Sequence, residues 1–336
     1  MSDRPRLDLT VEAPCRADLA GGTLDIWPLG VLHPGSVTVN AAIPVMVKLE
    51  LDLGAPEGEV WHAIDGGPWR VMGPVQAAAD LTAAVVFALR PAAGVRVVVR
   101  AQAAVGSGLG GSSAYAVALA KAVCELASET IGDERLVVLA RDLEARVLGV
   151  PTGVQDHWPA IRGGVLALHL EPGGERLEQL DVDAAWVGRR MTVFDTGIAH
   201  HSGMVNWQVI RRRLDGDAAT SAALDAIAGA ARDCRRCLLA GDERGVGEAV
   251  AREWAARRRL APEVCPSELG RLEATAAAVG AWGFKACGAG GGGSVLLWHG
   301  ADDREAIVEA LTAAAPAGRV VATGIARGGS KISRHL

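Results

Sequence analysis

The sequence predicts an α+β protein of two domains, and three observations lead to this class. The chain has 336 residues, which is enough for one large or two moderate domains with a sizeable core. Strand-like runs dominate before residues 180–190, and long helical patterns dominate after them. Strands and helices do not alternate regularly, which disfavours a repeated βαβ series. We therefore expect domains at residues 1–185 and 186–336.

The first domain reads as strands and helices around a glycine-rich loop. β-branched, partly alternating residues predict strands, and amphipathic or alanine-rich spacing predicts helices. Residues 54–70, rich in glycine and proline, are expected to form a hairpin or loop. The expected strands are 7–13, 36–53, 95–100 and 163–170, and the expected helices are 76–90, the segment from the glycine-rich loop to about 128, and 134–148.

The second domain is predicted to be mainly helical. Its apolar residues recur at helical spacing over long stretches, and short β-branched runs lie at its two ends. The expected strands are 190–194, 295–298 and 318–323, and the expected helices are 203–214, 218–240, 243–258, 266–280 and 302–314.

Composition excludes several functions and partners. The net charge of −5 disfavours a broad nucleic-acid surface. No apolar run approaches the ~20 residues of a membrane span, and no export signal is evident, so we expect a cytoplasmic protein without membrane contact. The six cysteines are scattered and are expected to be reduced thiols; the CxxC at 234–237 lacks a second ligand pair for zinc. Formation of a homodimer is possible on this composition.

The glycine-rich loop is the strongest sign of function. It lies between a predicted strand and a predicted helix, where free backbone N–H groups at the helix N-terminus suit a phosphate chain. The serine hydroxyls suit a magnesium ion or a phosphate oxygen. The cofactor-binding candidates are Gly106, Ser107, Gly108, Leu109, Gly110, Gly111, Ser112 and Ser113.

Other folds also use such loops. The spacing Gly106-x-Gly108-x-x-Gly111 fits a dinucleotide fingerprint, with Glu125 as the ribose acid. More than 100 residues precede the loop, and the predicted helix runs past Glu125, which disfavours that reading. A Walker loop would need a lysine, and none is present in the loop. A glycine-rich turn without a ligand is the remaining alternative.

Three ordered motifs make the chain resemble the GHMP kinases, a family that includes galactokinase, homoserine kinase and mevalonate kinase. The glycine loop resembles the ATP-binding motif, residues 13–25 resemble the first motif, and residues 283–294 resemble the third. The Ala-Gly-Gly-Thr-x-Asp form of the first motif resembles the sugar-kinase branch typified by D-glycero-D-manno-heptose 7-phosphate kinase. The resemblance implies an N-terminal domain like the second domain of ribosomal protein S5 and a ferredoxin-like C-terminal domain.

The resemblance also implies roles for single residues. Asp156 would be the catalytic base or would orient the attacking hydroxyl, and Arg16 would stabilise charge at the transferred phosphate. Ser112 and Glu144 would ligate Mg²⁺. The expected substrate-binding residues are Thr23, Asp25, His157, Gly290 and Gly291. Weaker candidates for holding a phosphorylated sugar are His200, His201 and the arginine runs 211–213 and 257–259.

The implied function is ATP- and Mg²⁺-dependent phosphorylation of a sugar or sugar phosphate. The specific expectation is heptose 7-phosphate phosphorylated at its anomeric hydroxyl. The alternatives are another small-molecule kinase of this family, of the galactose, fucose or mevalonate type, and a non-catalytic sugar or nucleotide sensor on the same scaffold.

Overall fold

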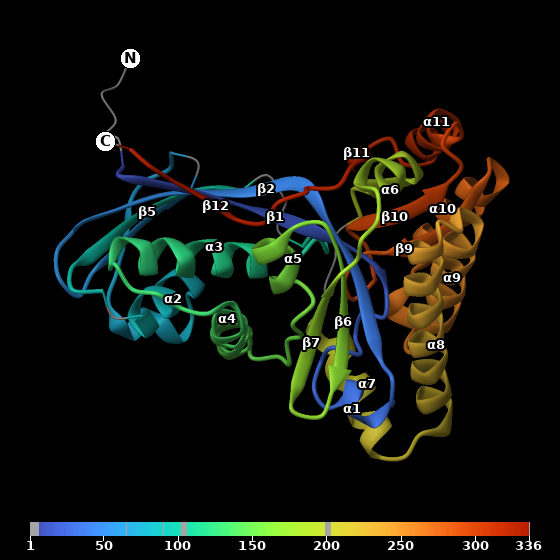
Figure 1. Cartoon of the computed structure of the whole chain (residues 1–336), viewed down its shortest axis with the longest axis horizontal. Helices are drawn as coiled ribbons and strands as arrows, with labels where there is room; N and C mark the ends of the chain where they lie inside the picture. The colour runs from blue at the N-terminus through green and yellow to red at the C-terminus, as the bar shows by residue number, and fades with distance from the viewer. Residues whose placement is uncertain (1–6, 65, 90, 102–105, 199–202, 336) are drawn as a thin grey trace.

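A computed structural model of the chain describes residues 7–64, 66–89, 91–101, 106–198 and 203–335. Two β-sheets organise these residues, and Figure 1 shows them meeting near the middle of the molecule. None of the helices in the described ranges is both long enough and apolar enough to cross a bilayer.

In the described part of the chain the larger sheet has eight strands, with the order β12-β1-β2-β5-β3-β4; β6 also pairs with β2, and β7 pairs with β6. Among the strand pairs that the structure describes in this sheet, β3–β5 alone is parallel. The strands are β1 (Leu9–Ala20), β2 (Val37–Ala55), β3 (Val60–Ile64), β4 (Arg70–Met72), β5 (Gly94–Ala101), β6 (Val165–Glu171), β7 (Gly174–Gln179) and β12 (Lys331–Arg334).

Helices cover one face of this sheet. The central helix α3 is alanine-rich, and ten of its residues are buried against the sheet and its neighbouring helices, which explains its place in the core. The helical segments of this part are α1 (Leu29–Leu32), the 3-10 segment η1 (Pro74–Ala78), α2 (Leu81–Leu89), α3 (Gly111–Leu126), α4 (Asp133–Leu148) and α5 (His157–Arg162).

The smaller sheet has four antiparallel strands in the order β11-β8-β10-β9. Its strands are β8 (Met191–Asp195), β9 (Ala281–Ala286), β10 (Ser294–His299) and β11 (Arg319–Ala322). Numbered within the domain, this is the order 4-1-3-2 of a ferredoxin-like fold, with a helical crossover after the first strand and another after the third.

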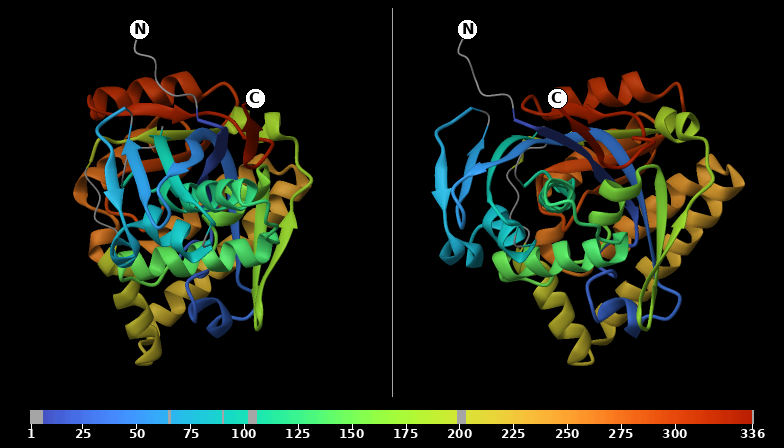
Figure 2. Two further views of the ribbon diagram at one scale, coloured as in Figure 1. Left: turned by 90° about the vertical axis from the view of Figure 1, so that its left-hand side faces the viewer. Right: turned by 60° about the vertical axis from the view of Figure 1, so that its left-hand side comes forward.

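The helices of this second part include α8, which has 23 residues, and α9, which packs against it. Figure 2 shows α8 and α9 (yellow to orange) at the opposite end of the molecule from the hairpin β3–β4 (light blue). The helical segments are α6 (Ala184–Arg190), α7 (Gly203–Leu214), α8 (Ala218–Ala240), α9 (Glu243–Arg257), the 3-10 segment η2 (Pro262–Val264), α10 (Ser267–Ala278) and α11 (Arg304–Ala314).

The structure confirms some of the sequence-based expectations and departs from others. β1 continues to Ala20 although residues 14–20 hold no β-branched residue, because pairing with β2 stabilises the extended backbone. The expectation of a hairpin or loop at 54–70 is confirmed: β3 pairs antiparallel with β4, the next strand along the chain. The final strand β12 leaves the second part of the chain and pairs with β1, so the larger sheet contains both ends of the described chain (Figure 1).

Candidate active site

A cavity of about 670 Å³ lies where β1, the glycine loop and the start of α5 meet the loop after β9. It brings together segments more than 100 residues apart in the chain. Among the predicted site residues, the cavity is lined by Arg16, Thr23, Asp25, Glu144, Asp156 and all eight residues from Gly106 to Ser113.

The glycine loop takes backbone conformations that only glycine adopts easily. Gly108 and Gly110 have φ of 73° and 71°, and Gly110 precedes the first residue of α3. A Cβ on Gly108 would lie 2.6 Å from the carbonyl oxygen of Cys287, so the loop after β9 packs directly on this backbone. The free N–H groups in the first turn of α3 therefore border the cavity, as phosphate binding requires.

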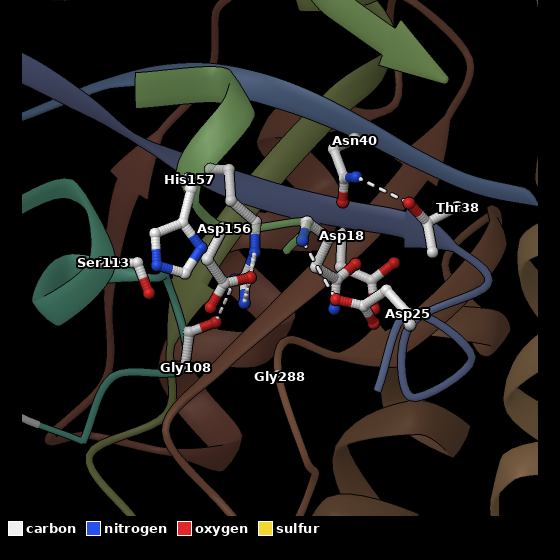
Figure 3. Close-up of polar contacts among 12 residues, drawn as sticks. Asp18, Asp25, Thr38, Asn40, Gly108, Ser113, Asp156, His157 and Gly288 are labelled. Atoms are coloured by element: carbon white, nitrogen blue, oxygen red, sulfur yellow. Dashed lines mark hydrogen bonds and ion pairs between the residues drawn. The ribbon is translucent and has the colours of Figure 1, made fainter. Parts of the chain in front are cut away.

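Arg16 and Asp156 form an ion pair beside this loop. Arg16 Nε lies 2.7 Å and Nη2 lies 2.6 Å from Asp156 Oδ1, and Arg16 Nη1 donates to the carbonyl of Gly108. Burial opposes the charge of Arg16, but the carboxylates of Asp156 and Asp18 hold its pKa above the ordinary value. Figure 3 shows Asp156 next to Gly108, so the predicted base and the predicted phosphate loop meet.

Ser112 and Ser113 both donate hydrogen bonds to Glu144, which reaches the loop from α4. The Ser113 Oγ to Glu144 Oε2 distance is 2.7 Å, and Ser112 Oγ bonds Oε1. Burial opposes ionisation of Glu144, but His157 and the two serines lower its pKa, so the side chain is a carboxylate.

This oxygen set fits Mg²⁺. A hydroxyl and a carboxylate oxygen lie together on the cavity wall, and Mg²⁺ prefers such hard oxygen ligands. No cluster of three or more acidic, histidine or cysteine side chains suited to a metal occurs among the described residues. Magnesium usually keeps waters and phosphate oxygens, so two protein ligands suffice.

The loop after β1 forms the other end of the cavity. Asp25 Oδ2 accepts a hydrogen bond of 2.9 Å from the backbone N–H of Gln155, while Asp25 Oδ1 is buried with no hydrogen-bond partner among the described residues. Burial, with the nearby negative charge of Asp156 and Asp18, raises the pKa of Asp25 to about 6. An unpartnered acceptor atom at a cavity wall suits a hydroxyl donor.

Some predicted residues lie elsewhere. His157 is fully buried, with Nε2 3.3 Å from Glu144 Oε2, and is not among the residues that line the cavity. Figure 3 shows it on the Ser113 side of Asp156, with Asp25 on the opposite side. Gly290 and Gly291 pack on Val264 instead of lining the cavity, which Gly288 and Ala289 border in their place.

The weaker candidates also separate. His200 and His201 lie outside the described residues. None of the three arginines of 211–213 lines the cavity: they contact Asp215, the Leu260 carbonyl and His33. In the run 257–259, Arg257 is buried and donates hydrogen bonds to Thr23 and to the Gly22 carbonyl, whereas Arg258 pairs with Glu273 at the surface.

The structure adds residues that the sequence did not point out. Gln155 and Asn206 also line the cavity. His62 lines it among apolar residues of β2, β3 and β5, and neither of its ring nitrogens has a hydrogen-bond partner among the described residues. No sequence motif surrounds His62, so its place in the site could not be predicted. It reaches the cavity because β3 pairs with β5.

Two related sequences match parts of the chain. D-glycero-alpha-D-manno-heptose 7-phosphate kinase of Campylobacter jejuni is 25% identical over 210 residues, which cover 61% of each protein. A bifunctional fucokinase/GDP-fucose pyrophosphorylase of Arabidopsis thaliana is 25% identical over 311 residues, or 85% of this chain. The matches span 61% and 29% of the lengths of these two relatives.

The fold is shared with solved structures. The galactokinase of Lactococcus lactis, solved as a complex with galactose, superposes with a TM-score of 0.81 over 96% of this chain and 95% of its own, at 15% identity. At this level of identity the likeness concerns the fold alone.

Family membership follows from two matched segments. Residues 75–164 match the GHMP kinases N terminal domain, and residues 234–317 match the GHMP kinases C terminal domain. The first segment contains the glycine loop, Glu144 and Asp156, and the second contains the loop after β9. The two segments occupy more than half of the chain, in the order expected from the three motifs, and the protein therefore belongs to the GHMP kinase family.

Proposed function

We propose that the protein is a sugar kinase that transfers the γ-phosphoryl group of ATP to a hydroxyl of a sugar or sugar phosphate. One observation carries the proposal: a single cavity joins the glycine loop to the Asp25 loop, with the Arg16–Asp156 pair between them. Phosphoryl transfer needs the donor phosphate and the acceptor hydroxyl held in line, and this arrangement provides a site for each.

Each residue of the pair has a distinct part in this chemistry. Asp156 would accept the proton of the attacking hydroxyl as its bond to phosphorus forms. Arg16 holds the Asp156 carboxylate in place and offers a fixed positive charge beside the loop, where negative charge develops on the transferred phosphoryl oxygens. The N–H groups of the glycine loop would bind the other phosphate oxygens.

Ser112 and Glu144 would hold Mg²⁺ at the phosphate end of the cavity. When bound there, the ion would neutralise part of the negative charge of the phosphates. His157 lies behind Glu144, in the core, so we propose that it orients this carboxylate and does not bind the sugar.

The specific acceptor that we propose is heptose 7-phosphate, phosphorylated at the anomeric hydroxyl. It rests on the form of the first motif and on the Campylobacter jejuni relative. Asp25, with its unpartnered buried oxygen, and Thr23 would accept hydrogen bonds from sugar hydroxyls.

A free sugar is the second candidate acceptor, and one observation favours it. Arg16 is the only arginine or lysine among the described residues that line the cavity, and it is already paired with Asp156. A sugar that carries a phosphate would gain from a second free cation. The fucokinase relative supports this candidate.

A substrate panel tests both candidates. ATP consumption would be measured with Mg²⁺ over free and phosphorylated hexoses and heptoses and over mevalonate, and the product would be examined by NMR for the hydroxyl that carries phosphate. Turnover with heptose 7-phosphate alone supports the first candidate, and turnover with free sugars supports the second. ATP binding without turnover on the whole panel would favour a sensor over a kinase.

Removal of the proposed base is the first prediction. Asp156→Ala should lower kcat by about 10²–10⁴-fold while ATP still binds, because the proton acceptor is lost and the glycine loop remains. The matched control is Asp142→Ala, which removes a carboxylate from an exposed position on α4. Calorimetric ATP binding and steady-state kinetics are the measurements, and an Asp156→Ala enzyme with undiminished kcat would contradict the assignment.

A further inference from the structure

Four charged side chains are buried together where the two sheets meet. Asp18 of β1, Glu253 and Arg257 of α9, and Lys285 of β9 are each at most 2% exposed. Burial opposes ionisation of Asp18, but Lys285, Arg257 and Arg16 lower its pKa. The four groups carry two negative and two positive charges, so each ion has an opposite charge at contact distance, which burial of ions requires.

The two cations of this cluster make different contacts. Lys285 Nζ lies 2.9 Å from Asp18 Oδ2 and 3.1 Å from Glu253 Oε1, and within the described chain its charge contacts are these two carboxylates. Arg257 also bonds Glu253, but its guanidinium continues past the acids toward the cavity.

The outer nitrogens of Arg257 hold two loops of the candidate active site. Nη2 donates to the carbonyl of Gly22 at 2.8 Å, and Nη1 donates to Thr23 Oγ1 at 3.0 Å. Nη1 also lies 3.4 Å from the carbonyl of Gly288, in the loop after β9. Thr23 and Gly288 both line the cavity, so a residue of the second domain anchors its acceptor-side wall.

The anchored loop needs such support. Thr23 has φ of 76°, a left-handed conformation that a β-branched residue rarely adopts and that surrounding contacts must maintain. Gly22 lies so close to the cluster that a Cβ would be 2.3 Å from Asp18 Oδ2 and 2.9 Å from Arg257 Nη2. The backbone of this loop is therefore fitted against the Arg257 guanidinium.

We propose that Arg257 is a positioning residue for the acceptor: it fixes the loop of Thr23 and Asp25 from the second domain, whereas Lys285 only balances the buried charge. The proposal rests on the proposed kinase function and assigns a specificity role to a residue outside the three motifs. The planar guanidinium of Arg257 donates to two backbone carbonyls and a hydroxyl at once. The single ammonium group of a lysine cannot reproduce this geometry.

The two cations provide a matched pair of variants. Arg257→Met and Lys285→Met each remove one positive charge from the same buried cluster, so both should lower the thermal stability. Only Arg257→Met should raise the KM for the acceptor, by about 10-fold or more, with the KM for ATP changed less than twofold, because a small misplacement of a substrate-binding loop is costly to binding and orientation. Arg257→Lys keeps the charge and should fold, yet it should show the same increase in acceptor KM.

A second readout does not depend on turnover. Backbone bonds from Leu24 N to the Gly21 carbonyl and from Ile26 N to the Thr23 carbonyl close the anchored loop. Hydrogen exchange of these two amides should accelerate at least tenfold in Arg257→Lys relative to Lys285→Met. This result would support the anchoring role even if the panel of sugars gave no turnover, so failure of the proposed function and failure of this inference are distinguishable.

Two results would overturn the inference. One is an Arg257→Lys enzyme with the acceptor KM and the loop exchange rates of the wild type. The other is an equal effect of Arg257→Met and Lys285→Met on both measurements, which would make Arg257 a partner in charge balance and nothing more.

Discussion

Asp25 shows how one side chain can serve binding at the expense of stability. One of its oxygens is fixed by the backbone N–H of Gln155, and the other is buried without a partner at the cavity wall. Burial and two neighbouring carboxylates raise its pKa from 3.8 to about 6. Between these values the folded protein binds more protons than the unfolded chain, so the contribution of Asp25 to stability falls as the pH rises from about 4 to about 6.

The second prediction follows from this linkage. Asp25→Asn removes the ionised form, so the variant should melt a few degrees higher than the wild type at pH 8, and the difference should shrink toward pH 4. The acceptor KM should rise, because a buried acceptor atom for a sugar hydroxyl is lost. Thermal unfolding at several pH values is the measurement, with the exposed Asp302→Asn as control. A difference in melting temperature that is the same at pH 4 and pH 8 would contradict the pKa argument.

At the scale of elements, the glycine loop is held by the loop that follows β9. Gly108 and Gly288 touch backbone to backbone: a Cβ on Gly288 would lie 3.2 Å from Gly108 Cα. The Ser294 N–H also donates to the Ser107 carbonyl at 2.9 Å. The phosphate loop of the first domain is thus shaped by the second domain as well as by its own glycines.

The third prediction separates the effect of the left-handed glycine backbone from the effect of contact with the loop after β9. Gly108→Ala and Gly149→Ala both place a side chain on a residue with φ near 70°, but nothing lies within 4 Å of a Cβ on Gly149. Gly149→Ala should lose about 1–2 kcal/mol of stability from the left-handed backbone alone. Gly108→Ala should lose more and should raise the KM for ATP, because its Cβ meets the Cys287 carbonyl. Chemical denaturation and ATP kinetics test this, and equal stability losses with unchanged ATP kinetics would refute it.

At the scale of the whole molecule, the end of the chain joins the two parts. After β11 the backbone returns to the larger sheet, where the Ala326 N–H bonds the Ala42 carbonyl and the Ser330 N–H bonds the Ala160 carbonyl. β12 then covers the edge of β1, the strand that holds Arg16 and Asp18. The strand that carries the predicted catalytic arginine is therefore paired on both sides.

The fourth prediction concerns the C-terminal segment that returns to the larger sheet after β11. A chain that ends at Gly324 loses these bonds and exposes the edge of β1, so its melting temperature should fall and its tendency to aggregate should rise. The control is Ile332→Ser, which changes a side chain 38% exposed and keeps the strand. Scanning calorimetry and light scattering are the measurements. A truncated chain that melts with the wild type would show that β12 adds nothing to the larger sheet.

The α+β class, most of the helices and the family can be predicted from the amino-acid sequence alone. These features depend on local patterns: helical periodicity, and glycines at positions where the loop needs φ near 70°. The order of the three motifs then pointed to one kinase family before any contact was visible. The short strand β12 was not predicted. Four residues are too few to show a periodic pattern, and its partner strand β1 lies more than 300 residues away in the chain.

Tertiary structure decided which of the candidate residues meet. Arg16 and Asp156 are 140 residues apart, and pairing of β1 in the sheet together with the start of α5 brings them to one cavity. The same packing turned His157 into the core behind Glu144 and placed Arg257, one of several arginines in sequence, against Thr23. Residue type and spacing cannot specify such contacts, because they depend on how distant elements pack and on which polar groups burial forces into pairs.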